Sequence, residues 1–281
     1  MSNPVPAVIK NIHEGPTRGI ITHGWKITST KLPILNAKEI ERAQAELDIP
    51  LPEMFFGNNR ITISNEHGFE LEFSPMEALK HVDASKEGGD KVKLAYSEEW
   101  KKKSERNHEH VKDVVKPYDW TYSTSYRCTV KLAPDGQDFK PTTDRINIEK
   151  LKLPEPINFY DENILFEDEL ADNGTAMLNV KMRVMPSGFF VLQRFFLRVD
   201  DVLFRLNETR IYHEFGTDYL IREYSSREET YDKIRAALPP YKGDDISQLT
   251  DPDWVSSKLP PPREQIIEKI NVVPSNTEQP K

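Results

Sequence analysis

Four consecutive stretches in the second half of the chain alternate between apolar and polar residues, and this pattern restricts the fold more than any other feature. In the first stretch, TAMLNVKMRVM, every second residue from Leu178 to Val184 is apolar. The other three stretches are GFFVLQRFFLRV, VLFRLNETRIYHE and DYLIREYSSRE. A period of two places the apolar residues on one face of a strand. Asp200 and Asp201 suit a tight turn between the second and third stretches, so we predict antiparallel strands.

Shorter signals in the first half predict a hairpin and short helices. Residues 60–73 hold two alternating runs around a turn. Asn36 and Glu39 have the spacing of a capping box at the start of a helix, and so do Ser74 and Glu77. The regular strand–helix alternation of a doubly wound fold is missing. We therefore predict a mainly β (α+β) fold, with a two-layer antiparallel β-sandwich-like core and short flanking helices.

The sequence predicts three parts along the chain. Residues 1–24 lack periodicity and contain scattered proline and glycine, so they are predicted to form a flexible N-terminal arm. Residues 25–237 hold most strand and helix signals and are predicted to form a single domain. Residues 238–281 are proline-rich with polyproline II character, and they include a short predicted docking helix, EQIIEKI, and a disordered end.

The stretch KPYDWTYSTSYRCTVKL also alternates, with large rings on one side. That side carries Tyr118, Trp120, Tyr122, Tyr126, Cys128, Val130 and Leu132. The period predicts one strand with a polar opposite face. Because buried hydroxyls need hydrogen-bond partners, we expect the Cys128–Leu132 end in the core and Tyr118 and Trp120 partly exposed as partner contacts.

Charge and cysteine content exclude several classes of protein. The formal net charge is −8 and the pI about 5.5, whereas a nucleic-acid binder usually carries a basic footprint. The single cysteine permits no internal disulfide, which fits a reducing compartment. The most apolar run is interrupted by Gln193 and Arg194, and no secretory signal is visible. We expect a cytoplasmic protein with access to the nucleus, which binds neither nucleic acid nor membranes.

Several arginines are spread along the β-rich half of this acidic chain. They are Arg183, Arg194, Arg198, Arg205, Arg210, Arg222 and Arg227. One interpretation is cross-strand pairing with acids such as Glu208 and Glu223. The other is a local site for a carboxylate or an acidic peptide, because a guanidinium binds a carboxylate through two hydrogen bonds. The pattern alone leaves both interpretations open.

Common catalytic signatures are missing from the sequence. It contains no phosphate-binding glycine loop, no nucleophile elbow and no His-Glu-x-x-His zinc motif. One enzymatic alternative is a metal-dependent enzyme that uses Glu167, Asp168 and Glu169, although neighbouring side chains point in different directions. A small-ligand-binding β-barrel is the other alternative, and arginines on the strands disfavour it. We predict no catalytic residue, metal site or cofactor.

Six motifs together resemble one known family. They are LPEMFFGNN, KPYDWTY, PTTDRINIEKL, ILFEDEL, KMRVMPSGFFVLQRFFLRVDDVLFRLNETRIYHE and REYSSRE. In this order they resemble the TIP-forty-one-like family, whose animal members are called TOR signalling pathway regulator-like, over about residues 25–227. The resemblance implies a non-enzymatic protein that binds catalytic subunits of type 2A serine/threonine protein phosphatases (2A, 4 and 6 type) and regulates them in TOR signalling. It also implies a further phosphatase-associated regulator of that pathway as a partner.

The resemblance implies contact residues as well. Glu77 stands where the family carries an acid on the helix after the first hairpin, and Ile146 is the isoleucine of PTTDRI. Leu206 and Glu208 stand where the family has Met and Asp, and Arg210 is retained. The resemblance implies a cleft for the phosphatase tail, which ends in a free carboxylate near a leucine and an aromatic residue. An arginine beside an apolar cleft would suit such an end.

Overall fold

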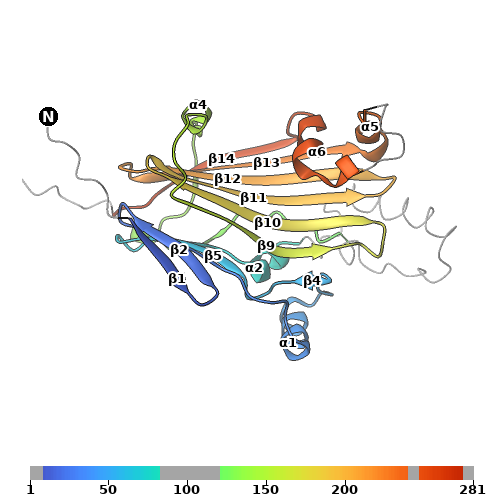
Figure 1. Cartoon of the computed structure of the whole chain (residues 1–281), viewed down its shortest axis with the longest axis horizontal. Helices are drawn as coiled ribbons and strands as arrows, with labels where there is room; N and C mark the ends of the chain where they lie inside the picture. Colours follow the sequence, from blue (N-terminus) through green and yellow to red (C-terminus); the bar gives the residue numbers. More distant parts are fainter. Residues whose placement is uncertain (1–8, 83–120, 240–246, 275–281) are drawn as a thin grey trace, which may run out of the picture.

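The computed structural model describes residues 9–82, 121–239 and 247–274, whose strands form two antiparallel sheets (Figure 1). The smaller sheet has six strands in the order β1-β2-β3-β5-β6-β7. They are β1 (Lys10–Glu14), β2 (Thr17–Thr22), β3 (Trp25–Thr30), β5 (Arg60–Asn65), β6 (Glu70–Phe73) and β7 (Thr129–Leu132). The larger sheet has eight strands in the order β4-β9-β10-β11-β12-β13-β14-β8. They are β4 (Met54–Phe55), β9 (Phe159–Asp168), β10 (Gly174–Met185), β11 (Gly188–Val199), β12 (Leu203–Glu214), β13 (Tyr219–Thr230), β14 (Glu264–Asn271) and β8 (Lys140–Pro141).

The described helices are short and flank the sheets. They are α1 (Ala37–Leu47), α2 (Pro75–Lys80), α4 (Ile148–Leu151), α5 (Tyr231–Arg235) and α6 (Pro252–Lys258), with the 3-10 turns η1 (Pro134–Gly136) and η3 (Ser247–Thr250). Figure 1 shows α6 over β12 and β13, and α4 toward the other end of these strands. Among the described residues, no helix combines the length and the apolar content needed to cross a lipid bilayer.

The main core lies between the two sheets. Leu178, Val180 and Met182 of β10 are at most 2% exposed, and they share one apolar cluster with Ile27 and Ile63 of the smaller sheet. The alternation in the sequence therefore directs one set of side chains inward, as predicted. The mainly β, two-layer fold is confirmed, and within the described residues the two sheets do not join into a closed barrel.

Two local predictions in the first half are confirmed. The side chain of Asn36 accepts a hydrogen bond from the backbone N–H of Glu39, whose carboxylate accepts one from the N–H of Asn36, so α1 begins with a capping box. Strands β5 and β6 form the predicted hairpin, with Ile61 opposite Phe73 and Ile63 opposite Leu71.

Residues 10–22 form a hairpin and not the predicted arm. Strands β1 and β2 pair along their length, and Ile20 is fully buried in the main core. Gly15, with a φ of +58°, and Pro16 lie between the strands and reverse the chain. The glycine and proline that suggested an arm are therefore turn residues.

The stretch EQIIEKI forms strand β14 and not the predicted helix. It pairs with β13 from Tyr219 opposite Asn271 to Ser226 opposite Glu264, and Ile270 joins the main core. Pairing along the whole strand satisfies the backbone, so tertiary context overrides the local pattern. Strand β14 therefore extends the larger sheet from within the predicted C-terminal segment. The division of the chain at residues 24 and 237 stays a prediction.

The alternating aromatic stretch does not form one strand. Only its end, β7, pairs with the smaller sheet. Tyr122 and Cys128 have φ values of +48° and +128°, which interrupt an extended backbone. Leu132 is 59% exposed, so the expectation that it lies in the core is wrong, whereas Cys128 and Val130 are partly buried and pack against the main core.

Residues 121–124 and Tyr126, which precede β7, are buried, and both sheets donate or accept hydrogen bonds with this segment. The side chains of Gln193 on β11 and Asn207 on β12 donate to the carbonyls of Tyr126 and Thr124. The hydroxyl of Tyr126 donates in turn to the carbonyl of Glu72 on β6. Side chains thus satisfy backbone groups that a strand partner would otherwise satisfy, so most of the segment is buried while Ser125 is exposed.

Replacing Tyr126 with phenylalanine should lower the free energy of unfolding by about 1–3 kcal/mol, because buried hydrogen-bonding groups lose their partner. The hydroxyl lies 3.0 Å from the carbonyl of Glu72 and 3.3 Å from the backbone nitrogen of Ser74. Urea unfolding measures the loss. Tyr160→Phe is the matched control, since Tyr160 is 52% exposed. A Tyr126→Phe protein as stable as the wild type would contradict this account.

Candidate binding site

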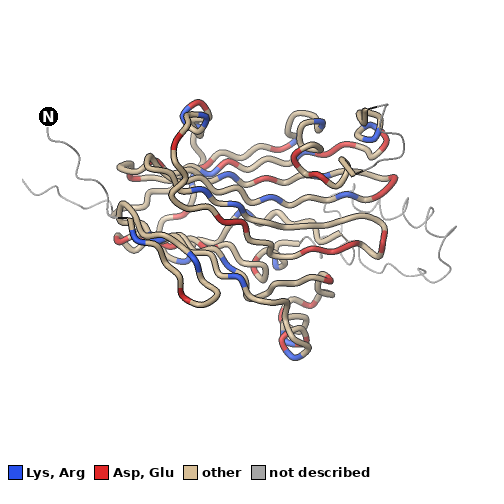
Figure 2. The backbone as a smooth tube through the Cα atoms, in the orientation of Figure 1, with Lys and Arg blue, Asp and Glu red and all other residues tan. Residues whose placement is uncertain are grey.

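The outer face of the larger sheet changes in character along β12. Near one end, Leu206 packs with Phe196 and Phe204 under α5 and α6. Near the other end, Tyr212 packs with Ile146. Between these apolar clusters the face is charged, and Figure 2 shows Lys and Arg at intervals along the central strands.

Glu208 is the centre of this charged region and has almost no contact with solvent, being 1% exposed. Its Oε1 accepts hydrogen bonds from Nε and Nη2 of Arg194, at 3.0 and 2.7 Å. Its Oε2 accepts from Nη2 of Arg210 at 3.1 Å and from Nη2 of Arg227 at 3.2 Å. Arg194 stands directly opposite Glu208 on the neighbouring strand, so the predicted cross-strand pairing is confirmed here. One buried carboxylate thus joins β11, β12 and β13.

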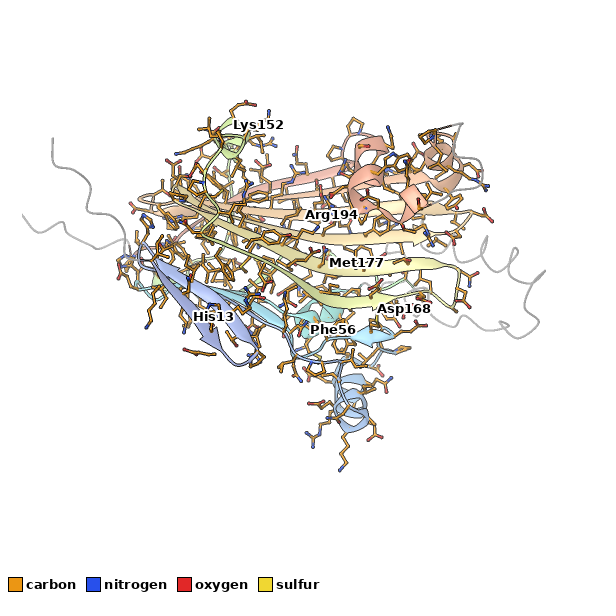
Figure 3. All side chains as sticks on the ribbon, in the orientation of Figure 1. His13, Phe56, Lys152, Asp168, Met177 and Arg194 are labelled. Carbon is orange, nitrogen blue, oxygen red and sulfur yellow. The ribbon has the colours of Figure 1, made fainter. Side chains whose placement is uncertain are left out.

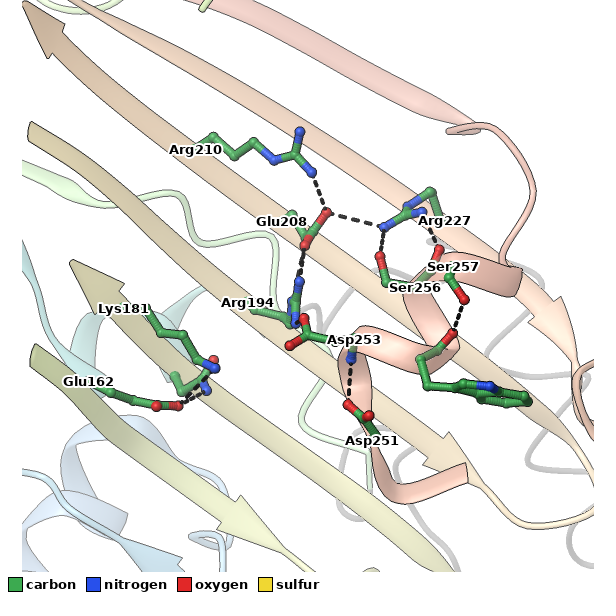
Figure 4. A network of polar contacts seen from close by, with 12 residues as sticks. Glu162, Lys181, Arg194, Glu208, Arg210, Arg227, Asp251, Asp253, Ser256 and Ser257 are labelled. Carbon is green, nitrogen blue, oxygen red and sulfur yellow. Dashed lines mark hydrogen bonds and ion pairs between the residues drawn. The ribbon is translucent and has the colours of Figure 1, made fainter. Parts of the chain in front are cut away.

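Helix α6 is attached to two of the same arginines (Figure 4). Nη1 of Arg194 donates to Asp253 at 2.6 Å. Arg227 donates to both the carbonyl and the hydroxyl of Ser256, at 2.8 and 2.5 Å. The arginines therefore connect the helix to the carboxylate of Glu208.

The charges in this network change the protonation of its acids. Burial by itself would raise the pKa of Glu208, but the positive charges of Arg194, Arg210 and Arg227 outweigh burial and hold the pKa below its ordinary value of 4.5. The hydrogen bond from Arg194 lowers the pKa of Asp253. Both acids are therefore ionised at neutral pH. Three guanidinium groups face two carboxylates, which leaves the network positive within an acidic protein.

A cleft of about 340 Å³ opens beside this network. Arg210 and Arg227 line it from the sheet, and residues 259–262, of sequence Leu-Pro-Pro-Pro, line another side. Arg145 and Glu223 form a further wall, joined by two hydrogen bonds of 2.8 and 3.2 Å. The cleft combines guanidinium groups with an apolar, proline-rich side, a combination that suits an extended peptide with an acidic group.

Arg210 is the arginine of the network that is most open to a ligand. Its side chain is 39% exposed, against 9% for Arg194 and 15% for Arg227. Within the described parts of the chain, Glu208 is its one hydrogen-bond partner and occupies a single nitrogen, Nη2. The other N–H donors of this fork remain available to a carboxylate.

Two predicted contact residues lie inside the protein. Ile146 is 4% exposed and packs against Tyr212 and Ile221, while its backbone N–H donates to Glu223. Leu206 is fully buried in a cluster that includes residues of η3 and α6.

Uncovering Leu206 would require α6 and η3 to leave the sheet, which would expose Leu249, Val255 and Leu259. Burial of each such side chain contributes about 1.5–3 kcal/mol. Their sum is comparable with the whole of the roughly 8 kcal/mol of a micromolar complex. The geometry therefore disfavours Leu206 as a direct contact and favours a supporting role beneath the cleft.

The remaining predicted residues do not join this cleft. Glu77 lies on α2 and lines a separate cavity of about 780 Å³, which Arg127 and Arg222 also line. Its carboxylate pairs with Lys80 at 3.0 Å rather than closing the predicted capping box, since Ser74 makes no side-chain cap. Tyr118 and Trp120 lie outside the described residues.

Sequence reasoning missed several residues of the site. Arg145, Asp253, Ser256 and the proline run 260–262 were not singled out, although the structure brings them to the arginines. The proline run was visible as a change in composition, but its position beside the sheet depends on the docking of α6. No local sequence pattern predicts that docking.

The acidic stretch at the end of β9 is structural. Asp168, at the end of the strand (Figure 3), accepts hydrogen bonds from the backbone N–H groups of Glu53 and Leu170. Burial, followed by the nearby charge of Glu169, raises the pKa of Glu167. Within residues 9–82, 121–239 and 247–274, no group of three or more His, Cys, Asp or Glu side chains is arranged to hold a metal ion.

Comparison with known proteins gives a consistent result. The model of the TIP41-like family matches residues 54–235. The chain is 45% identical over 251 residues to the TIP41-like protein of Homo sapiens, which covers 88% of this chain and 86% of the human one.

Two fungal relatives carry a functional name. The type 2A phosphatase activator TIP41 of Saccharomyces cerevisiae is 37% identical over 274 residues, covering 92% of this chain and 75% of the yeast protein. The type 2A phosphatase activator tip41 of Schizosaccharomyces pombe is 36% identical over 235 residues, covering 84% of this chain and 91% of its own.

Glu208→Gln should lower the free energy of unfolding by about 3 kcal/mol near pH 7, within the range for breaking a buried ion pair from one side. Because the native pKa of Glu208 lies below 4.5, the contribution of its charge is complete above that value and is lost as pH falls through the native pKa. Urea unfolding at about pH 7 and about pH 3 should therefore show a difference between the proteins that shrinks in acid.

The control for this measurement is Glu149→Gln, because the side chain of Glu149 is 83% exposed and pairs only with Lys152 in the described structure. Its effect should stay below about 1 kcal/mol at both pH values. A Glu208→Gln effect that is equally small, or independent of pH, would contradict the network described above.

Proposed function

Because the chain belongs to the TIP41-like family, we propose that it is a non-enzymatic regulator that binds the catalytic subunit of type 2A serine/threonine protein phosphatases. Two relatives are named as activators of such a phosphatase, which supports this partner. The proposal extends to catalytic subunits of the 2A, 4 and 6 type and to TOR signalling in the cytoplasm and nucleus, with a further phosphatase-associated regulator of that pathway as a partner.

The observation that carries the proposal is the exposed guanidinium of Arg210 in the cleft. The tail of the catalytic subunit, in this proposal, places its terminal carboxylate on Arg210. The apolar side of the cleft at Leu259 and residues 260–262 receives the neighbouring apolar side chain. Charge-assisted hydrogen bonds and burial then act on adjacent groups of the same tail.

The tail contact needs a second surface to reach useful affinity. Hydrogen bonds to a charged group contribute about 1.5–3 kcal/mol, and burial of one leucine contributes a similar amount. Together they fall short of the roughly 8 kcal/mol of a micromolar complex. Glu77, at the separate cavity between the sheets, is our candidate for the second contact, with Tyr118 and Trp120 as further candidates.

Arg210→Ala should weaken binding of a purified type 2A catalytic subunit roughly 10- to 100-fold, the equivalent of losing about 1.5–3 kcal/mol. Co-purification and titration with the immobilised protein measure this, with Glu77→Leu as a test of the second surface. Arg60→Ala is the matched control, since Arg60 is an exposed arginine of the smaller sheet outside both cavities.

Two results would count against the proposed function. One is a wild-type protein that binds no type 2A catalytic subunit. The other is an Arg210→Ala protein that binds as tightly as the Arg60→Ala control.

A further inference from the structure

The three guanidinium groups around Glu208 differ in their other hydrogen-bond partners. Arg194 is held from two sides, by Glu208 and by Asp253. Arg227 is also held from two sides, by Glu208 and by Ser256. Arg210 is held by Glu208 alone within the described structure, and its other side faces the cleft.

From this geometry we infer that Glu208 is a positioning residue, which aims Arg210 into the cleft and, through Arg194 and Arg227, keeps α6 docked beside it. The part of the inference that concerns a ligand rests on the proposed function. The part that concerns Arg210 and α6 does not, because it describes the free protein.

The hydrogen-bonding capacity of Glu208 supports this role over direct contact with a partner. A carboxylate offers about four acceptor sites. Two guanidinium nitrogens occupy Oε1 and two occupy Oε2. A partner donor would therefore have to displace an arginine from a group that is 1% exposed.

The benefit for binding is preorganisation. An arginine side chain has considerable rotamer freedom, and restricting it before the ligand arrives reduces the entropy lost on binding. Glu208 holds Nη2 of Arg210 on the strand that carries both residues. Its carboxylate also contacts the arginines that hold α6, the helix that leads into the proline-rich side of the cleft.

The inference makes separable predictions for the free protein. In Glu208→Gln, nitrogen relaxation should show a more mobile Nε–Hε group of Arg210. The amide hydrogens of Val255 in α6 and of Leu259, which caps the helix, should exchange with solvent roughly ten times faster. In Asp253→Asn only α6 should change, because Asp253 contacts Arg194 and does not line the cleft. Arg210→Ala should leave α6 unchanged.

Ser257→Ala is the matched control on α6, since Ser257 is exposed and its hydroxyl bonds, among the residues that the structure describes, only to the carbonyl of Trp254. It should alter neither the mobility of Arg210 nor the amide exchange of α6. Glu208→Asp is used if the Gln variant does not fold. It keeps the negative charge, but its shorter side chain moves the carboxylate oxygens away from the arginines. We therefore expect smaller changes in the mobility of Arg210 and in the amide exchange of α6. An Arg210 that stays as ordered as in the wild type in Glu208→Gln, or in Glu208→Asp where the Gln variant does not fold, would overturn the inference.

A double-mutant cycle with a purified type 2A catalytic subunit tests whether Glu208 acts through Arg210. Glu208→Gln and Arg210→Ala should each weaken binding about tenfold or more. The double variant should be weaker than Arg210→Ala by no more than the loss that Asp253→Asn, which disturbs α6 alone, causes by itself. Losses of about a hundredfold in the double variant, with Asp253→Asn binding almost as tightly as the wild type, would mean that Glu208 contacts the partner itself, which would overturn the inference. If the wild type binds no catalytic subunit, the proposed function fails, while the relaxation and exchange measurements still decide the positioning role.

Discussion

The buried carboxylate of Glu208 is the interaction on which the outer face of the larger sheet depends. It joins Arg194, Arg210 and Arg227 from three neighbouring strands, and two of these hold α6. Three guanidinium groups this close together would repel one another without a shared anion. Glu208 therefore allows a chain of net charge −8 to keep a positive cleft on one face. The group is buried, and each of its two oxygens accepts two hydrogen bonds from these arginines.

Much of the fold could be predicted from the sequence because local pattern and tertiary structure agree in its second half. The alternation from Leu178 to Val184 becomes β10, and the capping box at Asn36 begins α1. The errors occur where tertiary contacts override the local pattern. EQIIEKI has helical spacing but pairs with β13, and the stretch before β7 alternates but is hydrogen-bonded by side chains from both sheets.

The site was less predictable than the fold because it depends on register and docking. The arginines were conspicuous, and Arg210 lies in the cleft as the carboxylate interpretation requires. The turn after β11 has three residues, with Val199 opposite Leu203, and this sets Arg194 opposite Glu208. A two-residue turn at Asp200 and Asp201 would instead place Asn207 opposite Arg194. The contribution of α6 comes from distant apolar packing, which no local motif encodes.

The central claim is that guanidinium groups held by a buried acid recognise a terminal carboxylate. Titration with two synthetic peptides of the type 2A catalytic subunit tail, one with a free terminal carboxylate and one with its methyl ester, tests it most directly. The account predicts that the methyl ester binds roughly tenfold or more weakly at low salt, because it lacks the negative charge with which Arg210 pairs. Added salt should reduce this difference in affinity between the two peptides. Equal affinity for the two peptides would contradict it.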